Sequence, residues 1–187
     1  AQGNQDGNGI GDFYYEPPSG YLALCSDNLS DPSIADPTAH FNTVLYTGSD
    51  SSADRAITGV GFQPDLVWSK IRSTSFIHLL YDSVRGAGKA LRSHTTNAED
   101  SDYSAGYLSS FDSDGFSTVA GTANNTRHNY TSQTFAVWNW KAGGTASSNS
   151  DGTITSSVSA NTDAGFSIVG YTGTGSAATI GHGLSSA

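Results

Sequence analysis

The chain has 187 residues, a length that fits one sandwich-sized domain with parts of its neighbours better than two complete domains. Serine, threonine and glycine fill 29, 19 and 22 positions, and there are only two glutamates and three lysines, so the composition favours short strands and turns over long amphipathic helices. The formal net charge of −9 argues against binding to nucleic acid or to an anionic membrane surface, and no apolar run approaches the roughly 18 residues of a membrane span.

The N-terminal part predicts the end of one domain followed by a linker. Two strand-like apolar runs, 13–15 and 21–25, flank a proline-glycine turn at 17–20. Residues 26–39 contain two Asp-Pro pairs and little apolar surface, which favours an extended, semi-rigid connection. The single cysteine, Cys25, lies in the second apolar run, where we expect a buried, inert thiol and no internal disulfide.

The segment 40–143 predicts one complete antiparallel β-sandwich of jelly-roll type. Short apolar runs alternate with turn residues throughout it, and residues 112–115 have the Asp and Gly of a tight hairpin. The last run has large apolar residues on both of its faces, which predicts a central strand. The predicted strands are 41–46, 56–60, 65–70, 77–82, 89–91, 107–111, 115–119 and 134–141.

The large apolar residues of these strands predict the core. Sugar stacking needs an exposed aromatic ring, and because Trp68, Trp138 and Trp140 lie in apolar strands, we expect core packing and not a lectin platform. No helix longer than three turns is expected within 40–143. The predicted core residues are Phe41, Val44, Leu66, Trp68, Leu79, Phe116, Val137 and Trp138.

One pattern occurs twice. Residues 40–48 and 165–173 share Phe-x-x-Val-x-Tyr-Thr-Gly at an offset of 125 residues, the length of a whole sandwich domain. We therefore interpret 165–187 as the first strands of a repeated domain and 144–164 as a Ser/Thr/Gly linker with one strand at 152–158. Because the apolar runs at both ends of the chain would leave strand edges unpaired, we expect them to pair with other copies of the chain or with neighbouring domains.

Six motifs carry a family resemblance, namely 17–29, 40–48, 59–68, 81–89, 111–116 and 137–141. Their ordered series resembles phage tail-fibre and virion appendage proteins built from repeated concanavalin A-like, laminin-G-like or SPRY-like jelly-roll domains. The resemblance implies that 1–25 supplies closing strands of a preceding SPRY-like domain. It also implies an extracellular place in the virion and a homo-oligomer, a trimer as in fibres.

Function cannot be read from this fold, because lectins, glycanases and structural modules share it. Glycan hydrolysis needs two carboxyl groups across the scissile bond, which concanavalin-like glycanases usually draw from one strand. Here Glu16 adjoins Pro17 and Glu99 lies in the polar loop 95–102, so that pattern is missing. We therefore expect no enzymatic activity. The preferred interpretation is a structural and host-recognition module of a phage tail fibre or virion appendage, for which a host surface glycan is a candidate partner. The alternative is a secreted bacterial carbohydrate-binding module attached to a separate catalytic domain.

Basic residues cluster in one part of the sequence. Six of the eight lie between 55 and 92, where the only acidic residues are Asp65 and Asp82. The candidates for binding an acidic glycan are Lys70, Arg72 and Arg85, of which strand alternation puts the first two on one face. The alternative is that these charges are solvated strand edges that resist aggregation.

Calcium is the one cofactor that the sequence raises. Asp6, Asn8 and Asp12 are the candidate ligands, in a glycine-rich loop that resembles the calcium loops of thrombospondin type-3 repeats. Three oxygen side chains are few for calcium, so a glycine-rich turn without metal is the expected structure. Asp112 and Asp114 are explained by their hairpin turn.

Overall fold

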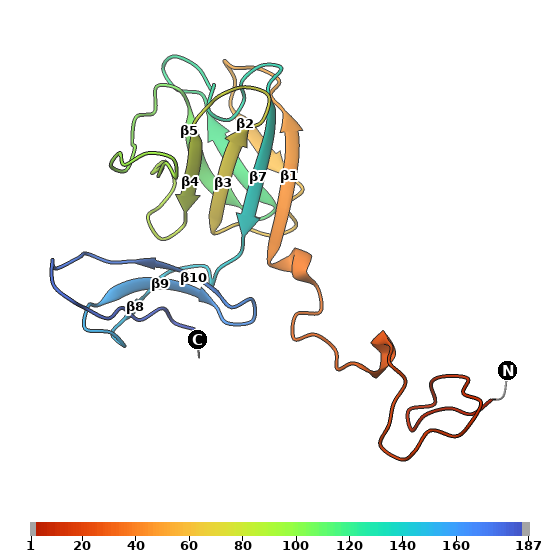
Figure 1. The fold of residues 1–187 in the computed structure, drawn as a ribbon. Coiled ribbons are helices and arrows are strands. Elements are labelled where there is room, and N and C mark those ends of the chain that lie inside the picture. The colour runs from red at the N-terminus through yellow and green to blue at the C-terminus, as the bar shows by residue number, and fades with distance from the viewer. Residues whose placement is uncertain (1–2, 185–187) are drawn as a thin grey trace. The chain divides into compact units, whose positions relative to one another are not determined.

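The structure is a computed structural model that describes residues 3–184. The chain divides into two compact units, 1–35 and 36–187, and Figure 1 follows it from red to blue. Within the described residues the regular elements are ten β-strands and two short 3-10 helices, η1 (Ser26–Asn28) and η2 (Pro37–Ala39), which confirms the all-β prediction. The strands are β1 (Phe41–Thr47), β2 (Arg55–Thr58), β3 (Leu66–Ile71), β4 (His78–Asp82), β5 (Tyr107–Asp112), β6 (Gly115–Val119), β7 (Thr134–Trp140), β8 (Ser147–Asn149), β9 (Ser156–Asn161) and β10 (Phe166–Gly170).

Strands β1 to β7 form an antiparallel sandwich. One sheet has the order β1-β7-β3-β4 and the other the order β2-β6-β5, with the first sheet in front in Figure 1. β7 lies between β1 and β3, so the predicted central strand is confirmed. Asp112 pairs with Gly115 across a two-residue turn, which confirms the hairpin. The predicted strand 89–91 is wrong, because this run makes only isolated bridges, from Ala90 to Asp100 and from Leu91 to Leu80.

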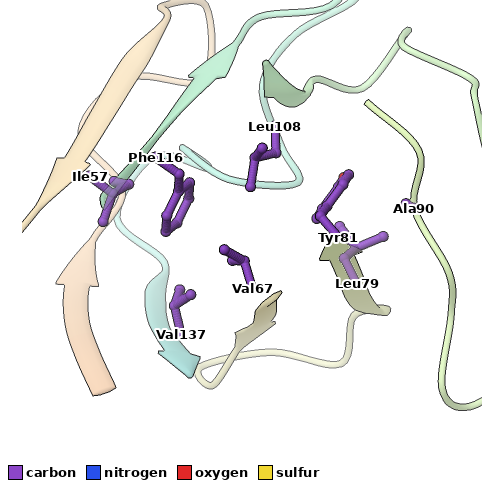
Figure 2. Close-up of a cluster of buried hydrophobic side chains, with 8 residues drawn as sticks. All are labelled: Ile57, Val67, Leu79, Tyr81, Ala90, Leu108, Phe116 and Val137. Carbon is purple, nitrogen blue, oxygen red and sulfur yellow. The ribbon is translucent and has the colours of Figure 1, made fainter. Parts of the chain in front are cut away.

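The core lies between the two sheets. Figure 2 shows its buried side chains converging from both sheets, with Val67 and Val137 on one side and Phe116 and Leu108 on the other. Burial of these apolar surfaces is the main stabilising contribution to the sandwich. The prediction is confirmed for Leu79, Phe116 and Val137, all at most 1% exposed.

The other five predicted core residues are not buried. Phe41 is exposed, and Val44, Leu66, Trp68 and Trp138 are half-buried. Val44 packs against the core from an edge strand, whereas the other four alternate onto the opposite face of the four-stranded sheet. Both faces of these strands are apolar, so alternation alone does not say which face the second sheet covers.

A second, smaller sheet with the order β10-β9-β8 follows the sandwich. Two of its strands, β8 and β9, occupy the segment 144–164 predicted as a linker. Strand β10, expected to pair with another copy of the chain or with a neighbouring domain, pairs with β9 instead, which corrects that expectation. A side chain at Gly143 would place its Cβ 2.3 Å from the carbonyl oxygen of Ala160, so this close approach of the sheet to the sandwich requires glycine.

The N-terminal unit is organised by a carboxylate. In the described residues 3–35, Asp6 is the only buried residue. Its carboxylate accepts hydrogen bonds from the backbone N–H groups of Asn8, Ile10 and Ala23 and from the side-chain amide of Asn28, at 2.7 to 3.0 Å. The bond from Ala23 is the largest of the effects that lower the pKa of Asp6 to about 2; the bonds from Ile10, Asn28 and Asn8 add to it against the opposing effect of burial.

The two strands predicted in this unit are wrong. Between residues 3 and 35 the only ladder contact is an isolated bridge from Asn4 to Phe13. Tyr14, Tyr15, Tyr21, Leu22 and Leu24 are exposed, Tyr15 at 79% and Leu24 at 102%, and Phe13, Ala23 and Cys25 are half-buried. A strand needs a partner for its backbone groups, and this unit offers no neighbouring sheet.

Replacing Asp6 with alanine is expected to abolish the order of the N-terminal unit without affecting the sandwich. Three backbone N–H groups and one side-chain amide lose their common acceptor, and no apolar core remains to hold the segment. Hydrogen exchange measured by mass spectrometry should show faster exchange over 3–35 and unchanged protection over 41–140. Asp27→Ala, at an exposed position of the same unit, is the control. Equal protection in Asp6→Ala and the parent chain contradicts this role.

Candidate functional site

The face of the four-stranded sheet that points away from the core carries seven large apolar residues, namely Phe41, Leu45, Leu66, Trp68, Leu80, Trp138 and Trp140. Fourteen strand residues alternate onto this face. Besides the pair Thr47 and Thr134 there are twelve, hereafter the outer face, in three rows across the sheet that lie about 7 Å apart along the strands. The rows are Leu45, Ala136, Lys70 and His78; Thr43, Trp138, Trp68 and Leu80; and Phe41, Trp140, Leu66 and Asp82.

Two tryptophans occupy the middle of the outer face. Trp68 and Trp138 are opposite each other on β3 and β7, with ring centroids 5.5 Å apart and an interplanar angle of 54°. The Trp68 Nε1–H donates to Nδ1 of His78 at 3.2 Å, which fixes the ring. Both tryptophans are half-buried, and Leu45 on β1 is 60% exposed. The prediction that these tryptophans are largely buried in the core is therefore wrong, and part of each side chain is open to solvent.

The third tryptophan, Trp140, has a different environment. Its ring centroid lies 4.9 Å from that of Phe41 and 6.3 Å from that of Phe166 on β10. Trp140 therefore links the sandwich to the small sheet, whereas the Trp68–Trp138 pair lies in the middle row of the face.

Basic groups adjoin this pair at one end of β3. Lys70 is in the row next to Trp68, and its ammonium donates to the carbonyl oxygens of Ile71 and Thr74 at 2.5 and 3.5 Å. Arg72, the second residue after Lys70, is exposed. Among the described residues no carboxylate makes an ion pair with either side chain. The register thus places Lys70 on the outer face, and Arg72 follows the last residue of β3.

The third basic candidate is engaged elsewhere. Arg85 forms ion pairs with Asp82 at 2.6 Å and Glu99 at 3.2 Å. It also donates to the carbonyl oxygens of Leu80 and Lys89, so it fixes the connection that follows β4. Because its donors are committed to these partners, Arg85 is removed from the ligand candidates. Its partner Asp82 is the only carboxylate among the twelve residues of the outer face.

Two histidines, His78 and His94, lie near Lys70 and Arg72, which are hereafter called the basic end of the outer face. The rings of His78 and His94 lie 5.6 Å apart, and the backbone N–H of His78 donates to Nδ1 of His94. Burial, with the charges of Lys70 and His94, lowers the pKa of His78, so its imidazole is neutral at pH 7. Sequence reasoning missed this pair because sixteen residues separate the two histidines, and only the chain reversal after β4 brings them together.

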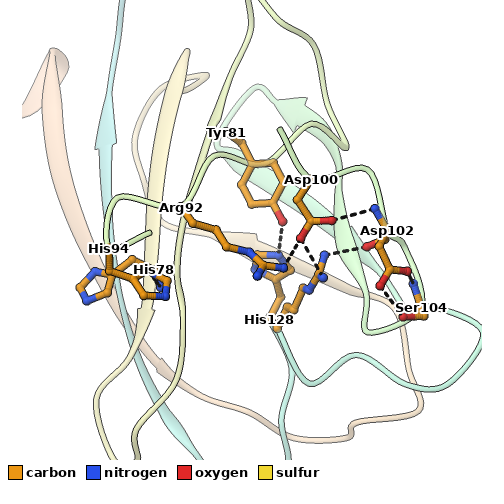
Figure 3. A network of polar contacts seen from close by, with 9 residues as sticks. His78, Tyr81, Arg92, His94, Asp100, Asp102, Ser104 and His128 are labelled. Carbon is orange, nitrogen blue, oxygen red and sulfur yellow. Dashed lines mark hydrogen bonds and ion pairs between the residues drawn. The ribbon is translucent and has the colours of Figure 1, made fainter. Parts of the chain in front are cut away.

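A second polar cluster lies inside the molecule (Figure 3). The Tyr81 hydroxyl is 3.1 Å from Nε2 of His128, and Arg127 donates to Asp100 and to the carbonyl oxygen of Asp102. His128 is fully buried, and this burial, with the charge of Arg127, lowers its pKa to about 3. Tyr81, Arg127 and His128 are buried and closed to a ligand, whereas Asp100 is half-buried and Asp102 is exposed. The cluster anchors the two long connections, 83–106 and 120–133, to the sandwich.

The predicted calcium ligands do not converge on one point. Both carboxylate oxygens of Asp6 accept N–H groups, the amide of Asn8 donates to Asn28, and Asp12 accepts from the backbone N–H of Gly3. Within residues 3–184 no three His, Cys, Asp or Glu side chains form a group that could hold a metal ion. Since N–H groups are donors, a loop that directs them at its central carboxylate does not fit a calcium site.

The fold and this surface define an antiparallel β-sandwich with a partly exposed aromatic face. Residues 36–187 match the model of a family described as a domain of unknown function, DUF7483, and the chain belongs to this family. No curated protein and no solved structure matches the chain. In the described part of the chain no helix has the length and apolar character needed to cross a membrane.

Proposed function

We propose that this protein is a non-enzymatic structural and host-recognition module of a phage tail fibre or related virion appendage, of the concanavalin A-like jelly-roll type, that binds a surface glycan on the outer face. The virion context comes from the resemblance of six motifs along the chain. The proposal that the ligand is a glycan is based on the arrangement of side chains on the outer face.

The observation that carries the proposal is the Trp68–Trp138 pair. The apolar faces of sugar rings stack on exposed aromatic rings, and two tilted tryptophans at 5.5 Å offer two adjacent stacking surfaces. Thr43 flanks the pair in the same row and His78 accepts from Trp68, so polar groups that could bind sugar hydroxyls lie at the margin. This mixture of an apolar platform and a polar margin is typical of small-ligand sites.

Replacing either tryptophan of the pair with alanine is expected to weaken glycan binding by about tenfold or more, which corresponds to about 1.4 kcal/mol. A glycan array probed with the parent chain identifies the ligand, and titration followed by tryptophan fluorescence measures the affinity. Tyr130→Ala, which removes an exposed aromatic ring from the β6–β7 connection, is the matched control. Absence of binding across the array, or full affinity in both tryptophan variants, overturns the proposal.

We further propose that the N-terminal unit assembles the protein into a homo-oligomer, with a trimer favoured by the fibre resemblance. In residues 3–35 no apolar side chain is buried, while Tyr14, Tyr21, Leu24 and Leu29 are each more than two-thirds exposed. Contact with the same unit of another copy would cover this surface. Sedimentation of the whole chain tests this: an oligomer that dissociates on Leu24→Ser supports the proposal, and a monomer contradicts it.

A further inference from the structure

We infer that the glycan bound on the outer face is an acidic oligosaccharide, whose rings stack on Trp68 and Trp138 and whose anionic group binds at Lys70 and Arg72. This inference rests on the proposed function, because it names the ligand class of the same site. It goes beyond that function in assigning a charge to the ligand and a direction to its binding.

The local charge of the outer face favours an anionic ligand. The chain as a whole has a formal net charge of −9, yet the only carboxylate on the outer face, Asp82, is neutralised by Arg85. Asp82 lies in the row furthest from Lys70. The outer face is therefore a region where an anion meets basic side chains without acidic neighbours, on a protein that otherwise repels anions.

The ammonium of Lys70 is held in place by backbone carbonyl groups and not by a carboxylate among the described residues. Its ammonium donates to two backbone carbonyl oxygens, which fix its position without neutralising it. A fixed cation loses little side-chain entropy when a ligand binds. Arg72 is exposed at the end of the same strand and offers a planar guanidinium that suits a carboxylate or sulfate group.

The spacing of Lys70 and Trp68 along β3 suits an oligosaccharide that contacts both residues. Lys70 is two residues from Trp68 on β3, a separation of about 7 Å along the strand. A sugar ring stacked on Trp68 therefore places a substituent of that ring, or the next residue of the oligosaccharide, within reach of the ammonium. The neutral His78 imidazole lies across from Lys70 in the same row, where it adds hydrogen-bonding capacity without competing for the anion.

The test uses the whole chain and matched ligands that differ only in charge. Oligogalacturonate is compared with its methyl ester, and hyaluronate oligosaccharides and sialylated oligosaccharides are compared with their uncharged counterparts, by calorimetry or fluorescence titration. We expect at least one acidic ligand to bind about tenfold more tightly than its neutral partner, and to lose this advantage when the salt concentration rises from about 0.05 M to about 0.5 M.

Substitutions at the basic end sharpen the test. Lys70→Ser and Arg72→Ser should each weaken binding of the acidic ligand about threefold or more and leave its neutral counterpart unaffected. Lys141→Ser is the charge-matched control, because Lys141 lines a different hollow, together with His40 and Asn161. Circular dichroism and thermal unfolding of each variant establish that it is folded.

The outcomes separate the two levels of the argument. Tryptophan-dependent binding of neutral glycans with no preference for acidic ones overturns the acidic ligand and leaves the glycan-binding function standing. If neither acidic nor neutral glycans bind, both are overturned. Tighter binding of a single-stranded oligothymidylate than of any acidic oligosaccharide also overturns the inference, since the surface then recognises nucleic acid.

Discussion

Replacing Phe116 with alanine is expected to lower the free energy of unfolding by about 3–5 kcal/mol. The Phe116 side chain is fully buried in β6 and packs in the cluster between the two sheets (Figure 2). Its removal loses the burial of an aromatic ring and leaves a cavity that the paired strands on both sides hold open. Urea unfolding followed by tryptophan fluorescence measures the loss.

The matched control for this substitution is Phe41→Ala. Phe41 is also a strand phenylalanine, but it is 40% exposed on the outer face and contacts Trp140. Its removal should cost about 1 kcal/mol, the scale of one aromatic contact at a surface. A similar loss for the two variants would mean that the outer face is as buried as the core, in contradiction to the partly exposed aromatic face described above.

The second large effect is a loss of stability in acid that originates at His128. The pKa of this imidazole falls from its ordinary 6.5 to about 3 in the folded chain, because burial and the neighbouring Arg127 oppose its protonation. The unfolded chain therefore binds a proton that the folded chain does not. The contribution of His128 to the free energy of unfolding is fully present above pH 6.5. It falls by about 1.4 kcal/mol per pH unit as the pH decreases from 6.5 toward 3.

Urea unfolding between pH 7.5 and pH 4.5 should accordingly show a loss of about 2–3 kcal/mol from this one group. The lower limit of this pH range lies above the pH at which aspartates take up protons in the folded chain; the pKa of Asp100, for example, is also lowered. His128→Gln should reduce the slope, while Tyr81→Phe, which removes only the hydroxyl at His128 Nε2, should preserve it. A slope unchanged in His128→Gln assigns the acid sensitivity to other groups.

Much of the sandwich could be predicted because its signals are local. The Asp112 to Gly115 turn fixes one hairpin, and the alternation of residues along β7 is enough to put Val137 and Trp138 on opposite faces. What alternation lacks is the identity of the covered face. That depends on how β2, β6 and β5 stack on the other sheet, which is a long-range property of the chain.

The site was predictable only in part for the same reason. Lys70 and Arg72 are near in sequence, so their cluster was visible, but the meeting of Trp68 with Trp138 depends on the pairing of strands 70 residues apart. The predicted strands near the N-terminus are the opposite case, in which a local sequence pattern is present but the structure has no strand. The apolar pattern of Tyr14, Tyr15 and Leu22 is typical of strands, but a pattern alone cannot supply a pairing partner.

The pairing of β1 with β7 also determines how the sandwich responds to mechanical tension. The chain enters the sandwich at Phe41 and leaves it at Trp140, and these two residues are direct partners in the ladder. The backbone N–H of Lys141 donates to the carbonyl oxygen of His40, so entry and exit are joined side by side. Tension along the chain therefore loads the hydrogen bonds of one residue pair at a time and unzips β1 from β7. Force applied at opposite ends of the two strands would instead load all the hydrogen bonds of the ladder at once, in shear. The sandwich lies beside the line of force, and stretching peels off its edge strand before it disturbs the buried cluster.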